Sequence, residues 1–419
     1  MKSNYKRLGD YIQLVDERNK DLKVKNLIGL TINKIFIPSV ANIIGTDMTN
    51  YKIIRKNQFA CSTMQVRRDK KMPLALHKSD EPAIISQAYP IFEIVDTNVL
   101  LPEYLMMWFT RAEFDREACF HAVGGVRGSL EWDDFLDFKL PIPSLEKQQE
   151  IVNEYHTIQN RINLNNQLIA KLEETAQTIY KQWFVDFEFP FDFAQGKPSE
   201  NGKPYKSNGG KMVWCEELEK EIPDGWEIAT VADLNLDISD GNYSGKYPKP
   251  HEFIEFGVPF VRGVDFNNKT IDSRNLIYIS EKKHNELKKG HLKKNDILIT
   301  TRGASIGKFA YVTNDFINKN INSQLIRING NDSYSNFYLG CMINTSAFKN
   351  LFDTYSTGSA QPQLPIKNFI QIDVIIPKKE VLNSFEKYNI LLNNFILKSK
   401  QNQKLEELKE LLLGRMVRN

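Results

Sequence analysis

The spacing of apolar residues predicts two long helices, one in each half of the chain. Between Ile151 and Trp183, apolar side chains recur at alternating intervals of four and three residues, which is the pattern of a coiled-coil seam. About 38 residues at ~1.5 Å per residue give a helix of about 57 Å, longer than a compact domain needs. The positions expected to pair are Ile158, Ile162, Asn165, Ile169, Leu172 and Ile179.

A second stripe of apolar residues near the C-terminus predicts the partner helix. Lys398 and Lys409 interrupt this stripe. Two such helices can bury their seams against each other, so we expect an antiparallel coiled coil that separates two globular domains. A polar residue at a seam, here Asn165, costs stability but fixes the register by requiring a polar partner. The pairing positions expected in the second helix are Leu391, Phe395, Asn402, Leu405 and Leu412.

Short apolar runs outside the helices predict strands, because Pro, Gly and Asn signals bound them. In the first half these runs are KIFIP, YKII, YPIFEIV and FKLPIP. In the second half they are VPFVRG, LIYIS, DILITT, QLIRI and IDVIIP. Each half therefore predicts a mixed α/β (α+β) domain followed by a long helix.

The two halves of the chain also align with each other. Tyr104 aligns with Tyr338, and the same offset aligns Gly124 with Gly358. Further aligned pairs are Asn57 with Asn295, Phe114 with Phe348, Leu130 with Leu364, and Lys171–Glu174 with Lys404–Glu407. Shared order over such a length predicts an internal duplication, with pseudo-twofold related domains.

These features divide the chain into five predicted segments. Residues 1–143 and 216–377 are the two domains, and residues 144–187 and 378–419 are the two helices. Residues 188–215 are rich in Gly, Pro, Ser, Asn and Lys, which predicts a linker or long loop.

The distribution of charge is more informative than the formal net charge of +3. The segments Tyr51–Lys78 and Lys282–Lys308 are both strongly basic. Two basic patches are typical of a polyanion bound at two places, although lysine runs are also common on ordinary solvated surface. Four isolated cysteines predict neither a disulfide framework nor a zinc site, and without a signal peptide or a long apolar segment we expect a cytoplasmic protein and no membrane contact.

Catalytic motifs are incomplete throughout the sequence. The segment Gly303–Phe309 resembles a phosphate-binding loop, but it is one residue short and has Phe309 in place of the magnesium-binding Ser or Thr. The six histidines lack helical pairing with each other or with carboxylates, and no methyltransferase motif for gripping a flipped base occurs. We therefore expect a non-catalytic chain without a metal site or a cofactor of its own.

Glycine-bearing polar loops in corresponding parts of the two halves are the remaining candidates for function. Arg can grip guanine through two hydrogen bonds, Asn and Gln can grip adenine, and Lys can neutralise phosphate. The alternative for each residue is an ordinary solvated loop. The candidate DNA-binding residues are Arg67, Arg68, Lys70, Lys71, Gln87, Arg127, Asn242, Tyr243, Lys246, Arg262, Arg302, Ser305, Lys308, Gln324, Gln361 and Gln363.

The order of domain, long helix, domain and long helix resembles the specificity subunits of type I restriction-modification enzymes over essentially the whole chain. Local sequence segments also resemble those of this family, namely FKLPIPSLEKQQEI, IYKQWFVDFEFPF, GKPYKSNGGKMVW, IPDGWE, VPFVRGVDF and DILITTRGASIGKFAYV. The first domain departs from that pattern, since NQFACSTMQVRRDKKMPLAL replaces the glycine-bearing segment.

The resemblance implies a subunit that recognises two half-sites in double-stranded DNA, while its helices set the number of unread base pairs between them. It implies two methyltransferase subunits as partners, with or without two restriction (translocase) subunits. Those partners would hold S-adenosylmethionine, ATP and magnesium, and one of them would flip the target adenine. The alternatives are a specificity factor of a methyltransferase-only or phage-defence complex and a stand-alone nuclease.

Overall fold

The computed structural model describes residues 5–39, 46–124, 128–243, 245–358 and 362–417. The chain forms two compact units. The first comprises Met1–Ile162 and Lys404–Asn419, and the second comprises Asn163–Gln403. Among the described helices, none combines the length and the apolar character that crossing a membrane requires.

The first unit is built around a four-stranded antiparallel sheet. Its strands lie in the order β2 (Ile12–Val15), β9 (Ile91–Ile94), β6 (Phe59–Cys61) and β7 (Leu74–Leu76). Phe59 and Phe92 face each other across two of these strands, and their rings stack at a centroid distance of 5.0 Å. This aromatic pair packs against the helices α2 (Pro102–Thr110), α3 (Ala112–His121) and α4 (Trp132–Leu136).

Three smaller strand pairs complete the first unit. Strand β1 (Tyr5–Arg7) pairs with β10 (Lys139–Pro141), where the chain enters the long helix. The other two pairs are β3 (Ile28–Leu30) with β4 (Phe36–Pro38), and β5 (Lys52–Ile54) with β8 (Ala83–Ile85).

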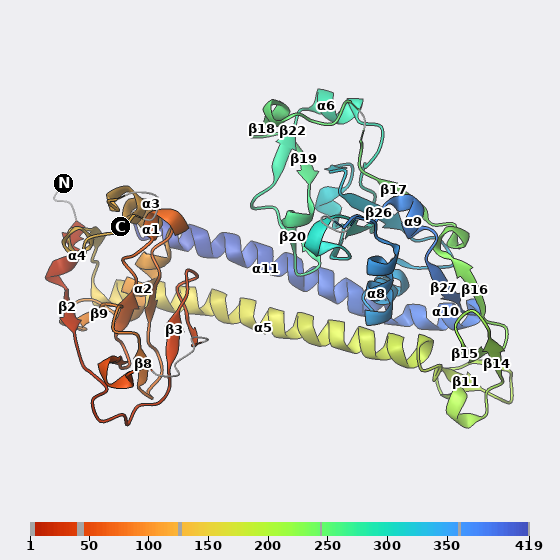
Figure 1. Cartoon of the computed structure of the whole chain (residues 1–419), viewed down its shortest axis with the longest axis horizontal. Coiled ribbons are helices and arrows are strands. Elements are labelled where there is room, and N and C mark those ends of the chain that lie inside the picture. Colours follow the sequence, from red (N-terminus) through yellow and green to blue (C-terminus); the bar gives the residue numbers. More distant parts are fainter. Residues whose placement is uncertain (1–4, 40–45, 125–127, 244, 359–361, 418–419) are drawn as a thin grey trace. The chain divides into compact units, whose positions relative to one another are not determined.

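The second unit repeats the central sheet of the first. Its strands lie in the order β17 (Asp237–Asp240), β26 (Leu325–Asn329), β23 (Ile297–Thr300) and β24 (Phe309–Tyr311), and Figure 1 shows β17 beside β26. The accompanying helices are α7 (Asn336–Ile343), α8 (Ser346–Tyr355) and α9 (Ile366–Phe369), and β16 (Glu227–Thr230) pairs with β27 (Asp373–Ile376). The predicted fold class of tandem, duplicated α/β domains is confirmed.

The duplication extends to the backbone conformation of single residues at two places. Asn57 and Asn295, which align in the sequence, both have left-handed backbone conformations, with φ of 66° and 65°. Gly124 and Gly358 also align, and their φ values are 95° and 89°. Both domains thus use the same turns at the same places.

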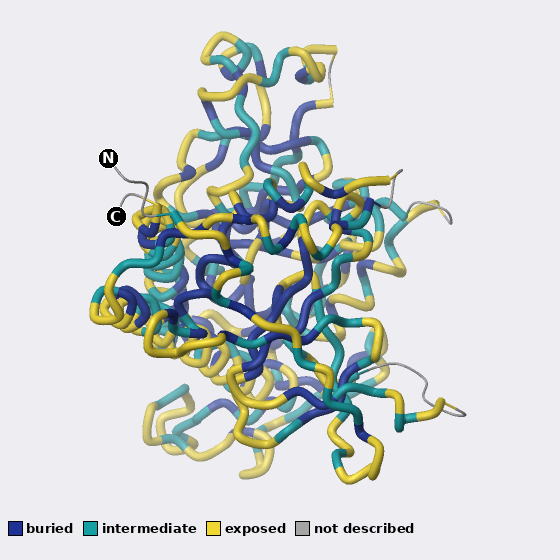
Figure 2. The backbone as a smooth tube through the Cα atoms, turned by 90° about the vertical axis from the view of Figure 1, so that its left-hand side faces the viewer, coloured by how far each residue is buried: buried dark blue, intermediate teal, exposed yellow. Residues whose placement is uncertain are grey.

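The second domain has additional strands beyond the shared sheet. One further sheet has the order β18 (Phe253–Ile254), β22 (Ile277–Ile279), β19 (Val258–Val261) and β25 (Asn320–Ile321). A short hairpin joins β20 (Phe266–Asn267) to β21 (Thr270–Ile271), and α6 (Glu281–Glu286) follows β22. Figure 2 colours the backbone by burial, with buried residues in dark blue.

The segment 188–215 is more ordered than its composition indicates. It forms β11 (Pro190–Asp192), β12 (Lys197–Pro198), β13 (Lys203–Pro204) and β14 (Met212–Cys215), and β14 pairs with β15 (Lys220–Pro223). Phe189 stacks on Tyr205 at 4.6 Å and on Trp226 at 5.6 Å. The linker prediction therefore departs from the structure, because interspersed aromatic residues give this Gly- and Pro-rich segment a packed core.

The two long helices pair within both units. Helix α5 (Leu145–Phe184) has 40 residues and α11 (Asn389–Arg415) has 27. In the first unit the beginning of α5 shares a buried cluster with Leu412 and Met416 at the end of α11. In the second unit Ile169 shares a cluster with Phe395 near the beginning of α11. The helices therefore run antiparallel, as predicted.

The second long helix begins later than its predicted segment, residues 378–419. A short helix α10 (Lys379–Phe385) and a 3-10 turn (Glu386–Tyr388) precede α11. The structure places the predicted pairing residues at buried or half-buried positions of the two helices. The fully buried ones are Ile162, Asn165, Ile169, Phe395 and Leu412, and the half-buried ones are Ile158, Leu172, Ile179, Leu391, Asn402 and Leu405.

A polar contact lies within this apolar seam. Asn165 is 2% exposed, and its Nδ2 donates to Oδ1 of Asn402 at 2.9 Å. Nδ2 of Asn402 donates in turn to Oδ1 of Asn166 at 2.8 Å. Since an unpaired buried amide is costly, this contact favours one register of the helices.

We predict that Asn165→Leu destabilises the protein by about 1 kcal/mol, because Oδ1 of the half-buried Asn402 loses its donor. The double variant Asn165→Leu with Asn402→Leu should recover most of that loss, since two apolar residues can pack where two amides paired. The midpoint of urea unfolding measures both effects. Equal loss in the single and double variants would contradict a paired role.

Candidate nucleic-acid interface

Four loops of the second domain meet beside the central sheet, and their backbones are bonded to one another. We call the described residues 241–243, 245–247, 301–308, 322–324, 357–358 and 362–364 the candidate recognition loops. The N–H of Thr301 donates to the carbonyl of Gln324 at 2.9 Å. The N–H of Leu364 donates to the carbonyl of Thr301, also at 2.9 Å. Thr301, at the end of β23, therefore fixes two neighbouring loops at once.

Arg302 and Gln363 form a side-chain pair at this junction. Nη2 of Arg302 donates to Oε1 of Gln363 at 2.9 Å, and both residues are half-buried. Among the described residues, Nε2 of Gln363 has no acceptor. The pair therefore presents hydrogen-bond donors, which are complementary to the two acceptors on the major-groove edge of guanine.

Tyr243 lies close to the same pair. Its side chain is 54% exposed. Partial burial and the carboxylate of Asp240 raise the pKa of the Tyr243 phenol, whereas the nearby Arg302 lowers it. A Cβ at Gly241 would lie 2.0 Å from the carbonyl oxygen of Asn322, so this close approach of two loops requires glycine.

The remaining candidates of this group differ in exposure. Asn242 is only 8% exposed, whereas the side chains of Lys246, Ser305 and Gln324 are exposed. The structure thus joins Arg302 to Gln363 directly, and it joins Gln324 to the neighbouring Thr301 through a backbone bond. Gln361 lies outside the described residues.

Arg262 and Lys308 are occupied by contacts within the domain. The guanidinium of Arg262 forms two hydrogen bonds with the carboxylate of Asp265, at 2.8 and 3.2 Å, and donates to the carbonyl of Asn275 at 2.9 Å. Nζ of Lys308 donates to the carbonyl of Phe266 at 2.9 Å. These two side chains hold the turns that flank the loops, and their bonding groups face the protein.

The first domain fixes its corresponding loops with the same backbone bond. The N–H of Leu130 donates to the carbonyl of Thr63 at 2.9 Å, as Leu364 does to Thr301. Gln65 has a φ of 64° at the position equivalent to Gly303, whose φ is 71°. A non-glycine residue in this region is strained, so the first domain keeps the left-handed backbone conformation at this position although it lacks the glycine.

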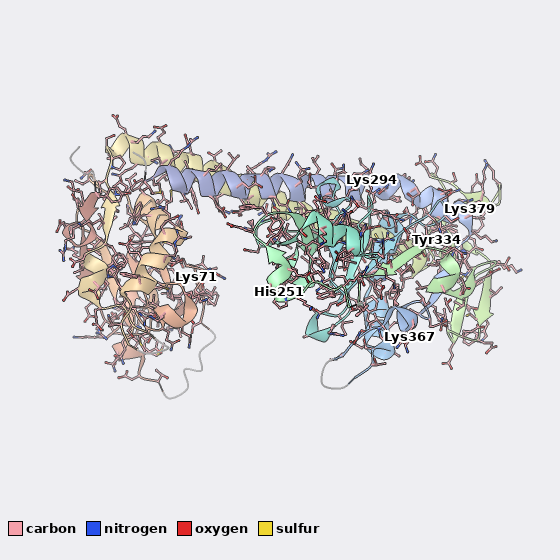
Figure 3. The ribbon with its side chains drawn as sticks, turned by 90° about the horizontal axis from the view of Figure 1, so that it is seen from above. Lys71, His251, Lys294, Tyr334, Lys367 and Lys379 are labelled. Atoms are coloured by element: carbon pink, nitrogen blue, oxygen red, sulfur yellow. The ribbon has the colours of Figure 1, made fainter. Side chains whose placement is uncertain are left out.

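The basic residues of the first domain divide into bonded and exposed groups. Nη2 of Arg67 donates to the carbonyl of Ala122 at 2.6 Å, and Arg68 pairs with the neighbouring Asp69 at 2.7 Å. Gln87 lies exposed in a turn that closes between Ser86 and Tyr89. The exposed lysines of the loop are Lys70 and Lys71, and Figure 3 labels Lys71. Arg127 lies outside the described residues.

Much of the positive charge in the two basic segments is compensated by acids from elsewhere in the chain. These acids lie outside the two segments, so the net charge of each segment alone overstates the positive charge at the surface. The ion pairs are Arg55–Glu17 at 2.6 Å, Lys56–Asp80 at 2.6 Å, Lys283–Glu252 at 2.7 Å, Lys289–Asp240 at 3.1 Å and Lys293–Asp237 at 2.7 Å. Exposed lysines such as Lys71 and Lys294 keep the segments positive (Figure 3).

A buried ion pair behind the first domain's loop escaped the sequence patterns. Lys34, from the β3–β4 turn, is 8% exposed, and its Nζ lies 2.8 Å from Oδ1 of Asp115 on α3. The same oxygen accepts the N–H of Met72 at 3.1 Å, directly after the basic loop. Burial lowers the pKa of Lys34, and Asp115 opposes that shift. One carboxylate thus connects a hairpin, a helix and the end of the loop.

Within the described residues, no cluster of three or more His, Cys, Asp or Glu side chains has the arrangement of a metal site. Burial raises the pKa of the Cys61 and Cys341 thiols, that of Cys341 to about 12. Both thiols therefore stay protonated near neutral pH and are poor nucleophiles. The loops of each domain instead present hydrogen-bonding side chains that can recognise a ligand.

Comparisons with known proteins agree with this geometry. A family model described as the type I restriction modification DNA specificity domain matches residues 75–174 and 223–409. The specificity subunit of the type I restriction enzyme HindI from Haemophilus influenzae is 24% identical and covers 92% of this chain and 91% of its own length. The MjaIX specificity subunit from Methanocaldococcus jannaschii is 23% identical over 77% of this chain and 70% of its own.

One solved structure shows the same fold. The crystal structure of the S subunit of a type I restriction-modification system from M. genitalium has a TM-score of 0.54 and 15% sequence identity. The match covers 98% of this chain and 95% of that one. The duplicated architecture is therefore shared at a low level of sequence identity.

We predict that Lys34→Met destabilises the first unit by about 3–5 kcal/mol, because it leaves the buried carboxylate of Asp115 without its cation. Lys23→Met is the matched control, since Lys23 pairs with Asp21 at 2.8 Å on the surface and should leave stability unchanged. Urea unfolding followed by fluorescence measures both. Similar unfolding midpoints for the two variants would contradict a structural role for the buried pair.

Proposed function

The chain belongs to the family of type I restriction modification DNA specificity domains, and we propose that it recognises a split DNA target and positions the other subunits of such a system on it. Its function is DNA recognition within a type I restriction-modification system. In this proposal one chain recognises both half-sites, and its partners carry out the chemistry.

The observation that carries the proposal is the duplication of one recognition scaffold. Thr63 and Thr301 follow the equivalent strands β6 and β23, and each carbonyl accepts the N–H of the aligned leucine, Leu130 or Leu364. Each domain therefore presents one set of polar loops in the same manner. Two presentations of this kind in one chain support two half-sites, and the long helices between the domains support unread base pairs between those half-sites.

Within each half-site, different residues have different roles. The pair of Arg302 and Gln363 contacts a base edge, and Tyr243 and Gln324 lie beside it. The exposed lysines Lys70 and Lys71 contact phosphate in the first half-site. Arg67, Arg262 and Lys308 position the loops, because their side chains are bonded to the protein itself.

The chemistry belongs to the partners in this proposal. The relatives are named as specificity subunits of restriction enzymes. We expect two methyltransferase subunits, joined in a restricting complex by two translocase subunits. These partners bind S-adenosylmethionine, ATP and magnesium and act in the cytoplasm. The present chain recognises the DNA target sequence and does not catalyse a reaction.

Adenine methylation across host DNA tests the proposal directly. We predict that deleting this gene removes methylation at one split motif and leaves all other methylation unchanged. Single-molecule sequencing of DNA from the intact and deleted strains measures this. An unchanged map would contradict the proposal, and metal-dependent cleavage by the isolated chain would favour a stand-alone nuclease instead.

We predict that Arg302→Ala relaxes one base pair of one half-site and weakens binding there by about 1–3 kcal/mol, because a bidentate contact is lost. Arg302→Lys should have the same effect, since an ammonium lacks the planar fork. The methylation map of each variant measures this. Arg68→Ala is the control in the other domain and should affect the other half-site alone. Uniform weakening on all DNA would make Arg302 a phosphate contact.

A further inference from the structure

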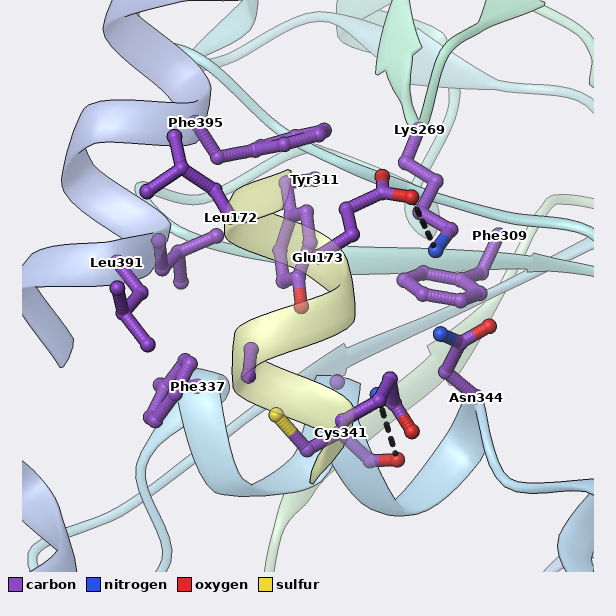
Figure 4. Close-up of a pocket in the computed structure, with 14 residues that line it drawn as sticks. Leu172, Glu173, Lys269, Phe309, Tyr311, Phe337, Cys341, Asn344, Leu391 and Phe395 are labelled. Carbon is purple, nitrogen blue, oxygen red and sulfur yellow. Dashed lines mark hydrogen bonds and ion pairs between the residues drawn. The ribbon is translucent and has the colours of Figure 1, made fainter. Parts of the chain in front are cut away.

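The hairpin of β20 and β21, residues 266–271, contacts both long helices. We call it the docking hairpin. Its two turn residues, Asn268 and Lys269, have left-handed conformations, with φ of 46° and 55°, as in the tight type I′ turn. This turn projects Lys269 toward α5, where its Nζ lies 3.2 Å from Oε2 of Glu173 (Figure 4).

The second contact of the docking hairpin is with α11. Nε2 of Gln403 donates to the carbonyl of Ile271 at 2.8 Å. The Nζ of Lys269 also lies 5.3 Å from the centre of the Phe309 ring, which limits the positions that the lysine can take. The hairpin is therefore held by one side chain from each helix.

The opposite side of the docking hairpin is bonded to the recognition turns. The carbonyl of Phe266 accepts Nζ of Lys308 at 2.9 Å, and Lys308 ends the loop that contains Arg302. The N–H of Asp272, directly after the hairpin, donates to the carbonyl of Asp265 at 2.8 Å. Asp265 in turn holds Arg262. A continuous set of bonds therefore links the helices to the loops.

A small pocket lies beside this contact. Its cavity volume is about 40 Å³, and it lies between α5, β24, α7 and α11. Apart from the ion pair of Glu173 and Lys269, its walls are mostly apolar (Figure 4), and they include Leu172, Ala176, Phe309, Phe337, Leu391 and Phe395. Phe309, Phe337 and Phe395 belong to the buried core that packs this domain on the helices. The polar contacts of the hairpin add directional constraints to that packing, because hydrogen bonds and ion pairs require a defined geometry.

The duplicated helix positions lack these contacts. Glu406 aligns with Glu173, but it pairs with Lys409 on its own helix, at 2.6 Å. The position that aligns with Gln403 is Ala170, which has no side-chain donor. The two polar contacts are thus specific to the second domain, and the first copy provides an internal control.

We propose that the docking hairpin fixes the orientation of the second recognition domain on the helix pair and thereby determines which spacing between half-sites the subunit accepts. This inference rests on the split-target function proposed above. One base pair changes the separation of half-sites by about 3.4 Å and their relative rotation by about 35°. A domain held at one angle meets its half-site at one spacing, whereas a domain that can swing also accepts neighbouring spacings. Glu173, Lys269 and Gln403 are positioning residues.

The test compares spacings with the full chain in its assembled methyltransferase complex. Competition binding uses duplexes with the native spacer and with spacers one base pair shorter or longer. In the double variant Glu173→Gln with Gln403→Ala, we expect the preference for the native spacer to fall about threefold to tenfold. The bases required within each half-site should stay the same. Glu406→Gln is the matched control and should leave the preference unchanged.

A rescue variant separates positioning from general damage to the fold. Exchanging the charges, with Glu173→Lys and Lys269→Glu, restores the ion pair and should restore the spacing preference that either single change weakens. A loss of folding would not be repaired in this way. If the charge-exchange variant folds but does not regain the spacing preference, the role of this pair is overturned.

A measurement without DNA distinguishes failure of this inference from failure of the proposed function. Spin labels at the exposed positions Asn393 on α11 and Lys249 in the second domain report one distance distribution, which should broaden in the double variant. An unchanged distribution overturns the docking role, and a broadened one with an unchanged spacer preference overturns the spacing role. A wild-type complex without any spacer preference overturns the split-target function instead, while the label distances still decide whether the hairpin docks the domain.

Discussion

Both hydrophobic cores depend on the antiparallel packing of α5 against α11. Leu412 and Met416, near the end of the chain, lie in the core of the first unit with Ile151. Ile169 and Phe395 lie together in the core of the second. Each core therefore includes side chains that are distant in sequence, so neither domain encloses its core with its own segment alone. Folding of the two halves is coupled through the helices, because burial of apolar surface is the main stabilising term.

The candidate recognition loops rest on a second kind of interaction, which is local to each domain. A threonine carbonyl at the end of a central strand accepts the N–H of a leucine in the neighbouring loop, Leu130 or Leu364. Charged side chains add further contacts to these loops, and those contacts differ between the two domains. Arg67 is bonded to a loop carbonyl in the first domain, and Arg302 is bonded to the amide of Gln363 in the second.

The sequence predicted those features that depend on periodicity and on repetition. The coiled-coil seam, the polar position Asn165, the strands and the tandem architecture all follow from spacing along the chain. It did not indicate contacts between distant residues. Arg262 is held by Asp265 and by a distant carbonyl, Arg55 is compensated by Glu17, and the loop-like segment 188–215 folds around Tyr205. The distant partners in these examples are the Asn275 carbonyl, Glu17, and Trp226, on which Phe189 stacks. They lie outside the local sequence windows of Arg262, Arg55 and the segment 188–215.

The bond between Thr301 and Leu364, like that between Thr63 and Leu130, joins one peptide group to another. Peptide groups are the same whatever side chains they carry, so this bond survives almost any substitution in the loops themselves. Gln65 at the position of Gly303 is a case within one chain, because the backbone keeps its left-handed conformation there although the side chain differs. Such a scaffold can acquire new target preferences by mutation without first losing its fold, and each of its two halves can do so on its own.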